Sequence, residues 1–262
     1  MDLHLSGKRI LITGASKGIG YAVAEAFAQE GCHLRLVARS ENALALAARE
    51  LHAAYGVDVQ FQPLDLANRE SAAELPALCE DIDVLVNNAG SIPAGTLLDI
   101  DEARWRDAWD LKVFGYINLS RVCFGAMKAN AKGGVIVNVI GTTAERLDSG
   151  YIAGSSANAA LVAFTRALGS TSDAAGVRVL GVSPGPVESD RLEMLVKRRS
   201  LTRLGDESRW REILTNMPFG RPAKPAEIAA ATPHKLDLTG SVSLLRLSSI
   251  KTKRNNTIIA PA

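Results

Sequence analysis

The sequence contains few of the residues that mark secreted or metal-binding proteins. Its three cysteines, Cys32, Cys79 and Cys123, are far apart and form no CxxC pair. This usage is typical of a reducing compartment and predicts neither a disulfide nor a zinc site. The four histidines are scattered without metal-ligand spacing, so we expect no metal.

Long apolar runs are also missing. No stretch approaches the roughly 18 residues that a membrane span needs, and the amino-terminal residues lack the basic start and apolar middle of a signal peptide. Hydrophobic residues make up 47% of the chain and charged residues 22%, which is enough apolar material for a globular core. We therefore predict a cytoplasmic protein with no membrane partner.

Acidic and basic residues are nearly balanced in number, except near the carboxyl terminus. The chain carries 30 basic and 28 acidic residues, yet residues 232–262 hold five basic residues against Asp237 alone. No aromatic residue lies among these charges, so the pattern favours a solvated terminus over a nucleic-acid partner.

Short β-branched runs alternate with segments that have helical periodicity. Apolar strand patterns occupy residues 8–14, 33–38, 57–62, 82–88, 133–139 and 176–183. Helical patterns occupy residues 19–31 and 41–55. This alternation predicts a doubly wound parallel sheet, a Rossmann-like α/β fold, in one domain over 1–231. Because ligands of such sheets bind at the carboxyl ends of the strands, the residues after each strand are the candidates for function.

The first of these connections is the glycine-rich turn "TGASKGIG", residues 13–20. Glycines let the backbone approach a pyrophosphate, which the free N–H groups of the following helix stabilise. Its spacing resembles the TGxxxGxG signature of the short-chain dehydrogenase/reductase family. The resemblance implies cofactor contacts from Gly14, Ser16, Lys17, Gly18, Ile19 and Gly20.

Three further motifs carry the same resemblance, in the family's order, as far as about residue 190. They are "LDL" (64–66), "NNAG" (87–90) and "PGPVES" (184–189). The family uses such segments around the adenosine and the nicotinamide. The resemblance therefore implies further cofactor contacts from Asp65, Leu66, Asn88, Ala89, Gly90, Pro184, Gly185, Val187, Ser189 and, on the nicotinamide side, Tyr151.

The residues after the second strand indicate which nicotinamide cofactor is used. An Asp or Glu there bonds the ribose 2′-hydroxyl of NAD, but this chain has Ala38 and Arg39. Arg39 can pair with a 2′-phosphate through its planar fork. Lys17 adds a second cation and Ser40 a hydroxyl donor. We therefore predict NADP(H), although both cations also fit the description of ordinary solvated surface charges.

The resemblance also implies hydride transfer between the cofactor and a small-molecule carbonyl or alcohol substrate. In this family a tyrosine acts as general acid or base and a serine polarises the carbonyl. A lysine four residues after the tyrosine binds the ribose and lowers the pKa of the tyrosine, and an asparagine supports a proton-relay water. Tyr151, which opens the helical text "YIAGSS", matches the tyrosine.

The other three roles are not filled by the usual residues. Ser155 stands where the lysine is expected, Gly141 lies opposite the serine, and Asp110 takes the place of the asparagine. Thr142, or its neighbour Thr143, could supply the missing hydroxyl. The separation between Gly141 and Tyr151 is also shorter than the family's. Carbonyl reduction, which needs a protonated tyrosine, is favoured over alcohol oxidation. The alternative is an NADP-binding protein that does not turn over and serves a structural or sensing role.

Residues 188–217 fall where the family has a mobile substrate lid. Leu192, Met194, Leu195 and Trp210 could form an apolar wall, and Arg198, Arg199 and Arg203 could meet an anionic group, but any amphipathic surface helix has this pattern. After residue 231 the resemblance stops, and Pro233 is expected to break the helix. We treat 232–262 as a divergent basic segment and leave open whether it forms the family's last helix and strand. The resemblance also implies a homodimer or homotetramer.

Overall fold

The computed structural model describes residues 4–130, 133–215, 217, 220–234 and 242–247. A seven-stranded sheet in the order β3-β2-β1-β4-β5-β6-β7 forms its centre, and every neighbouring pair of strands is parallel. The strands are β1 (Arg9–Thr13), β2 (His33–Ala38), β3 (Val59–Pro63), β4 (Val84–Asn87), β5 (Gly134–Val139), β6 (Val177–Pro184) and β7 (Val242–Leu247). This arrangement confirms the prediction of a Rossmann-like parallel sheet.

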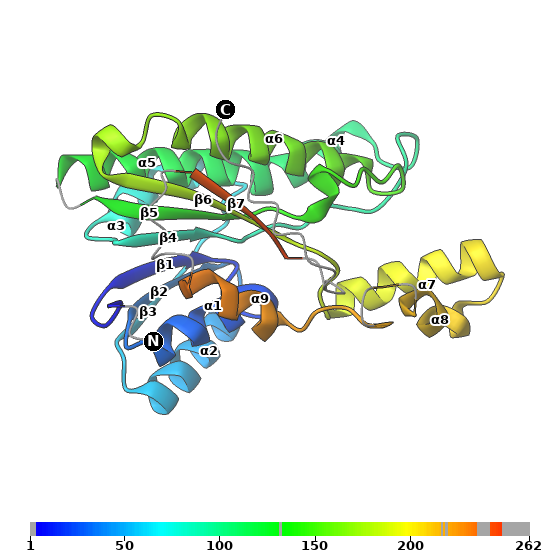
Figure 1. Ribbon diagram of the computed structural model, residues 1–262, viewed down its shortest axis with the longest axis horizontal. Coiled ribbons are helices and arrows are strands. Elements are labelled where there is room, and N and C mark those ends of the chain that lie inside the picture. Colours follow the sequence, from blue (N-terminus) through cyan, green and yellow to red (C-terminus); the bar gives the residue numbers. More distant parts are fainter. Residues whose placement is uncertain (1–3, 131–132, 216, 218–219, 235–241, 248–262) are drawn as a thin grey trace, which may run out of the picture.

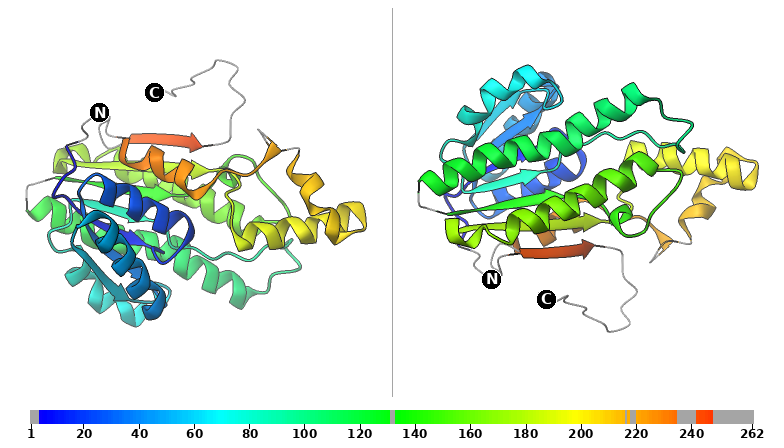
Figure 2. Two further views of the ribbon diagram at one scale, coloured as in Figure 1. Left: turned by 90° about the horizontal axis from the view of Figure 1, so that it is seen from below. Right: turned by 90° about the horizontal axis from the view of Figure 1, so that it is seen from above.

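Helices cover both faces of the sheet (Figure 1). One face carries α1 (Gly18–Gln29), α2 (Glu41–Tyr55) and α9 (Pro225–His234). The other face carries α3 (Leu75–Cys79), α4 (Glu102–Trp109), α5 (Gly115–Ala129) and α6 (Ile152–Gly169). Two helices, α7 (Asp190–Leu204) and α8 (Trp210–Leu214), project beyond the end of the sheet (Figures 1 and 2).

The alternation of side chains along β1 explains why the sheet has a core on each face. Ile10 and Ile12 belong to the cluster under α1 and α2, whereas Leu11 belongs to the cluster under α3 and α5. All three side chains are fully buried. Strands that are buried on both sides read as continuous apolar runs, which is why "RILIT" and its counterparts were recognisable in the sequence.

The carboxyl-terminal segment contributes more to the fold than its sequence indicated. Helix α9 continues to His234, one residue beyond Pro233. Strand β7 pairs with β6 from Val179 opposite Val242 to Pro184 opposite Leu247. The last strand, left open by the sequence, is therefore present, while the basic residues from Lys251 onward lie outside the described residues.

The cysteine prediction was wrong. Cys79 of α3 and Cys123 of α5 form a disulfide between two helices that pack together on one face of the sheet. Their separation in the sequence gave no sign of this pairing, because only the packing of α3 on α5 brings the two side chains together. Cys32 is a buried free thiol, and burial raises its pKa to about 12.

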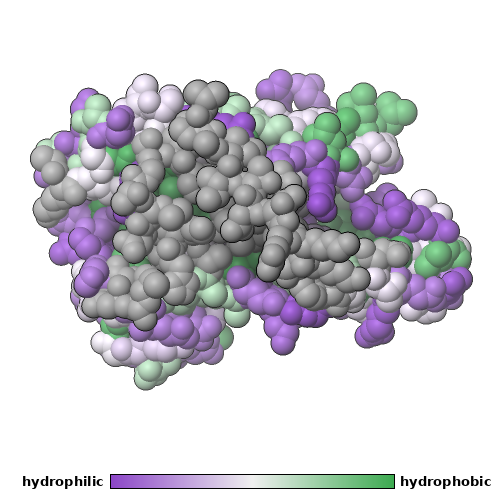
Figure 3. All heavy atoms as spheres, in the orientation of Figure 1, coloured by the Kyte–Doolittle hydropathy of each residue, from purple (hydrophilic) through white to green (hydrophobic). Residues whose placement is uncertain are grey.

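The projecting helices have a largely hydrophilic surface on the face drawn in Figure 3, with a hydrophobic area at their far end. Met194 and Leu201 of α7 are exposed by 66% and 53%.

Among the helices of the described residues, none combines the length and the apolar character that a membrane span requires.

Candidate active site

The glycine-rich turn between β1 and α1 lies at the carboxyl edge of the sheet, where Gly14 N and Ala15 N donate to the Val37 carbonyl. Gly14 and Gly18 have φ angles of +66° and +61°, a conformation that side chains other than glycine's rarely adopt. Lys17 precedes the first turn of α1 without capping it, and that turn contains no acidic residue. The amino terminus of α1 can therefore stabilise an anion. Ser16 and Ile19 are partly buried in the same turn.

The "NNAG" segment after β4 is bonded directly to this turn. The backbone N–H groups of Asn88 and Ala89 donate to Thr13 Oγ1 over 2.9 and 3.0 Å. The side-chain Nδ2 of Asn88 donates to the Thr13 carbonyl over 3.0 Å. A Cβ on Gly20 would overlap the Gly14 carbonyl. Two segments far apart in the sequence thus form one rigid floor at the sheet edge.

Arg39 and Lys17 are both exposed, and neither forms an ion pair within the described residues. Ser40 caps α2, its Oγ accepting from Ala43 N over 3.4 Å. The proton of that hydroxyl remains able to donate to a ligand. The end of β2 therefore offers Arg39 and the Ser40 hydroxyl, with no carboxylate among Ala38, Arg39 and Ser40, and the turn after β1 offers Lys17 as a second cation.

Asp110, which the sequence grouped with the tyrosine, lies beside the segment that follows β3. It lines a cavity of about 230 Å³ together with Leu66 and Phe114. Asp65 directly precedes Leu66, and its Oδ1 accepts a hydrogen bond from Ala67 N over 3.0 Å. The structure thus puts Asp110 next to the segment for which adenine contacts were predicted, and no described hydrogen bond joins it to Tyr151.

Tyr151 lies at the start of α6, where its backbone forms a bridge with Gly95. Its ring covers Gly154: a Cβ on Gly154 would overlap the Cε1 and Cζ atoms of the ring. The hydroxyl accepts from Arg191 Nη2 over 3.3 Å, and the guanidinium carbon lies 5.7 Å from the ring centroid. The Tyr151 ring therefore packs on Gly154, and its hydroxyl is contacted by the Arg191 guanidinium.

The hydroxyl of Ser155 bonds the loop that precedes Tyr151. Ser155 Oγ accepts from Asp148 N over 3.1 Å, and the side chain is buried. Asn158, one turn further along α6, is only 3% exposed, and its Nδ2 donates to Thr143 Oγ1 over 2.7 Å. Asn158 Oδ1 is buried and has no partner within the described residues. A buried amide oxygen in this state is a site at which a ligand hydroxyl can donate.

The hydroxyl of Thr142 makes no hydrogen bond within the described residues, whereas that of Thr143 is occupied by Asn158. Gly141, before them, has a φ of +137°, and a Cβ there would come within 2.8 Å of Asn158 Nδ2. Because an accepting hydroxyl can still donate its proton, both threonines that the sequence offered could replace the serine, and Thr142 is the one without a partner among the described residues.

Lys112 is a functional candidate that the sequence reasoning missed. It lies in a π-helical turn, Asp110–Phe114, and its Nζ donates to the Ile140 carbonyl over 2.8 Å at the end of β5. Burial, and next the charge of Arg191, lower the pKa of Lys112 to about 8. The sequence pattern gave the place of the asparagine to Asp110, two residues before this lysine.

The segment after β6 leads from the sheet into the projecting helices. Pro184 ends β6, Gly185 follows, and Val187 bridges to Ala223. Ser189 caps α7, its Oγ accepting from Leu192 N over 3.1 Å. The cap fixes the first turn of α7, which carries Arg191 back to the tyrosine.

Of the lid arginines suggested as anion ligands, Arg199 is already paired. Its Nη2 lies 2.6 Å from Asp148 Oδ2, which ties α7 to the loop before Tyr151. The sequence could not distinguish this paired arginine from an unpaired one, since both lie on the same charged helix.

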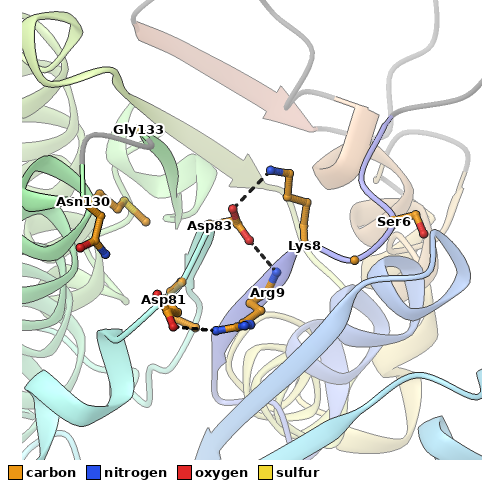
Figure 4. Close-up of a pocket in the computed structure, with 10 residues that line it drawn as sticks. Ser6, Lys8, Arg9, Asp81, Asp83, Asn130 and Gly133 are labelled. Carbon is orange, nitrogen blue, oxygen red and sulfur yellow. Dashed lines mark hydrogen bonds and ion pairs between the residues drawn. The ribbon is translucent and has the colours of Figure 1, made fainter.

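A larger cavity of about 380 Å³ lies at the opposite edge of the sheet (Figure 4). Its charged groups neutralise each other: Lys8 Nζ lies 3.3 Å from Asp83 Oδ1, and Arg9 Nη1 lies 3.0 Å from Asp81 Oδ2. The four charged side chains that line this cavity therefore pair with one another. No group of three or more metal-ligating side chains occurs within the described ranges.

The comparison with protein families agrees with this geometry. The family model described as short chain dehydrogenase matches residues 8–200. The chain therefore belongs to the short-chain dehydrogenase family and is an oxidoreductase of that class.

Two curated relatives cover most of the chain. One is the 3-oxoacyl-[acyl-carrier-protein] reductase FabG of Vibrio cholerae, 32% identical over 87% of this chain and 89% of its own length. The other is a galactitol 2-dehydrogenase (L-tagatose-forming) of Cereibacter sphaeroides, 34% identical over 87% of each chain. Among solved structures, the L-sorbose reductase of Gluconobacter frateurii, complexed with NADPH and L-sorbose, matches with a TM-score of 0.85 and 29% identity. That match covers 97% of this chain and 100% of the reductase.

Proposed function

We propose that this protein is an NADP(H)-dependent oxidoreductase that reduces a small or medium-sized carbonyl compound, with Tyr151 as the proton donor. One observation carries the proposal. The backbone at Tyr151 is bonded to Gly95, in the segment that follows β4, and the Tyr151 hydroxyl is contacted by Arg191. The same segment begins with the residues that bond to the glycine turn. A hydride donor bound along that edge and a proton donor would then reach the same substrate.

The residues present fit a dinucleotide phosphate at three points. The uncapped amino terminus of α1 suits a pyrophosphate. The unpaired Arg39 and Lys17 suit a 2′-phosphate. The orphaned Asn158 Oδ1 suits a ribose hydroxyl, a role that the sequence had given to Ser155. That a related L-sorbose reductase was solved with NADPH supports the same choice.

When bound, NADPH supplies the hydride for the carbonyl carbon. Tyr151 Oη donates its proton to the carbonyl oxygen, and Arg191 stabilises the charge that the phenol oxygen acquires. Thr142 Oγ1 is the available donor to polarise the carbonyl. We assign Asp110 to the adenosine side, because it lines a cavity with Leu66.

The domain division and the assembly belong to this proposal. Residues 1–231 form the catalytic domain with a lid at about 188–217, and residues 232–262 add β7 to its sheet. We further propose a cytoplasmic location and, as the family resemblance implies, a homodimer or homotetramer. Light scattering of the purified protein tests the assembly, and a monomer would contradict it.

Titration of the purified protein with NADPH and, separately, with NADH tests the cofactor assignment. We expect micromolar NADPH binding and NADH binding at least about tenfold weaker, because only NADPH offers Arg39 and Lys17 a charged partner. Equal affinities would refute the assignment, and no binding of either would refute the enzymatic proposal.

A further inference from the structure

Two cationic side chains from distant parts of the chain contact the segment that follows β4. Arg191, in the first turn of α7, donates to the Tyr151 hydroxyl over 3.3 Å and to the Ile92 carbonyl in the loop after β4. Lys112 reaches the same region from the π-helical turn before α5, with Nζ at the Ile140 carbonyl. We call these two side chains the Lys112–Arg191 pair.

The two side chains meet this segment two residues apart, Arg191 at the Ile92 carbonyl and the Lys112 stem beside Gly90. The charge of Arg191, together with burial, lowers the pKa of Lys112. The Lys112 stem lies against Gly90, since a Cβ on Gly90 would come within 3.0 Å of Lys112 Cδ. Glycine at position 90 therefore leaves room for the lysine between the "NNAG" segment and the end of β5.

The pair has no acidic counterpart within the described residues. The hydrogen-bond partners of Lys112 and Arg191 are carbonyl oxygens and the tyrosine hydroxyl, and no described ion pair contains either residue. Asp148, in the loop before Tyr151, is paired with Arg199. Two like charges partly removed from water are unfavourable unless an anion approaches them.

The cofactor's own anionic groups are not suited to this place. The uncapped helix terminus and Arg39 would accommodate phosphates at the ends of β1 and β2, whereas Arg191 contacts Tyr151 and the segment after β4, and Lys112 contacts the end of β5. The anion must then come with the substrate. A carboxylate matches a guanidinium and an ammonium through charge-assisted hydrogen bonds.

We propose that the Lys112–Arg191 pair binds a carboxylate of the substrate, so that the carbonyl reduced beside Tyr151 is that of an oxo acid. The inference rests on the proposed function, for which it names the substrate class. It also assigns Lys112 a role in substrate binding that the sequence did not indicate.

Equilibrium binding tests the pair without turnover. Pyruvate, acetoacetate and levulinate, which place the carboxylate one, two and three bonds from the carbonyl carbon, are titrated by calorimetry into the protein saturated with NADP⁺. Their methyl esters serve as uncharged counterparts. We expect at least one acid to bind about tenfold or more tightly than its ester, since charge-assisted hydrogen bonds are roughly twice as strong as neutral ones. Equal affinity of every acid and its ester would overturn the proposal.

Substitutions assign the effect to the pair. Lys112→Met is expected to remove the preference for the acid and Lys112→Arg to retain it. Lys128→Met, which changes an exposed lysine of α5, should leave it unchanged. Should Lys112→Met fail to fold, Arg191→Gln makes the same test. Retention of the full preference in Lys112→Met or Arg191→Gln would overturn the proposal.

The outcomes separate this inference from the proposed function. NADPH oxidation with equal kcat/KM for acids and esters would leave the oxidoreductase standing and remove the carboxylate site. Acid-selective binding without NADPH oxidation would keep the site and remove the catalytic proposal.

Discussion

The cofactor edge and the catalytic edge of this molecule differ in how far they follow the family pattern. Around β1, α1 and β4, the glycine turn and the "NNAG" segment are present and bonded to each other. Around β5 and α6, three of the four usual catalytic residue types are missing, and Lys112, Arg191, Thr142 and Asn158 lie there instead.

This difference indicates that a binding site made largely of backbone is constrained differently from one made of side chains. The proposed phosphate site would depend on N–H groups and on glycines with positive φ, which few substitutions preserve. A proton donor with a cation beside it can be assembled from several elements. Here α7 and the turn before α5 contribute cations that the sequence pattern would have placed on α6.

Removal of the Tyr151 hydroxyl should separate the two edges most strongly. In Tyr151→Phe we expect carbonyl-dependent NADPH oxidation to fall by about a hundredfold to ten-thousandfold, the usual contribution of a positioned acid. NADPH affinity should change little, because the ring remains. The absorbance of NADPH follows the rate and its fluorescence the binding. Undiminished turnover would show that another group donates the proton.

The space under the tyrosine ring is the next point of test. In Gly154→Ala the new methyl overlaps the ring of Tyr151, so the ring must move at a cost of about 1–3 kcal/mol. We expect kcat to fall roughly tenfold to a hundredfold, while NADPH affinity stays unchanged. Gly125→Ala is the matched control, because nothing lies within 4 Å of its added Cβ. Equal rates for the two variants would contradict the role of Gly154.

A change at the cofactor edge should have the opposite effect. Arg39→Asp removes the cation and adds a carboxylate at the end of β2, so NADPH binding should weaken about tenfold or more relative to NADH. Arg49→Asp makes the same charge change on the exposed side of α2 and should not alter the ratio. An unchanged ratio of the two dissociation constants in Arg39→Asp would refute the assignment of the 2′-phosphate site.

The smallest effect is expected from pH. Lys112 is protonated below its pKa of about 8 and neutral above it, so oxo-acid binding should weaken several-fold between about pH 7 and about pH 9. The charged or titratable neighbours of Lys112 are Arg191 and Tyr116, and burial raises the pKa of Tyr116. Calorimetry at several pH values measures the change, and Lys112→Met should flatten it. A pH-dependent affinity that persists in Lys112→Met would point to another group.

The fold was predictable because strands buried on both faces leave continuous apolar runs. Strand β2 occupies the residues that the sequence indicated, and β1 and β5 differ from their patterns only at the ends. Strand β7 was not predictable, because "VSLLRL" lies in the segment where the resemblance to the family has stopped. Its partner β6 is also some sixty residues away in the sequence. Pairing across such a separation depends on the edge that β6 leaves open.

Of the candidate site, the glycine turn and Tyr151 were legible, while the neighbours of Tyr151 were not. The rule of four residues along a helix selected Ser155, whose hydroxyl bonds the Asp148 backbone. Gly154 and Asn158 have the same spacing, and Gly154 lies at the longer separation from Gly141 that the family shows. The tyrosine ring covers the position that a side chain at 154 would occupy, which residue spacing alone could not reveal.

The sequence by itself determined the parallel sheet, the phosphate-binding turn and the cations near the end of β2. These features depend on local periodicity, on glycine's backbone freedom and on residues a short distance apart. The tertiary structure alone decided that Cys79 meets Cys123, and that Arg199 forms an ion pair while Arg191 forms none within the described residues. It also decided that Arg191 contacts Tyr151 and that Lys112 contacts the end of β5. Contacts of this kind join elements that only packing brings together, so no local pattern along the chain records them.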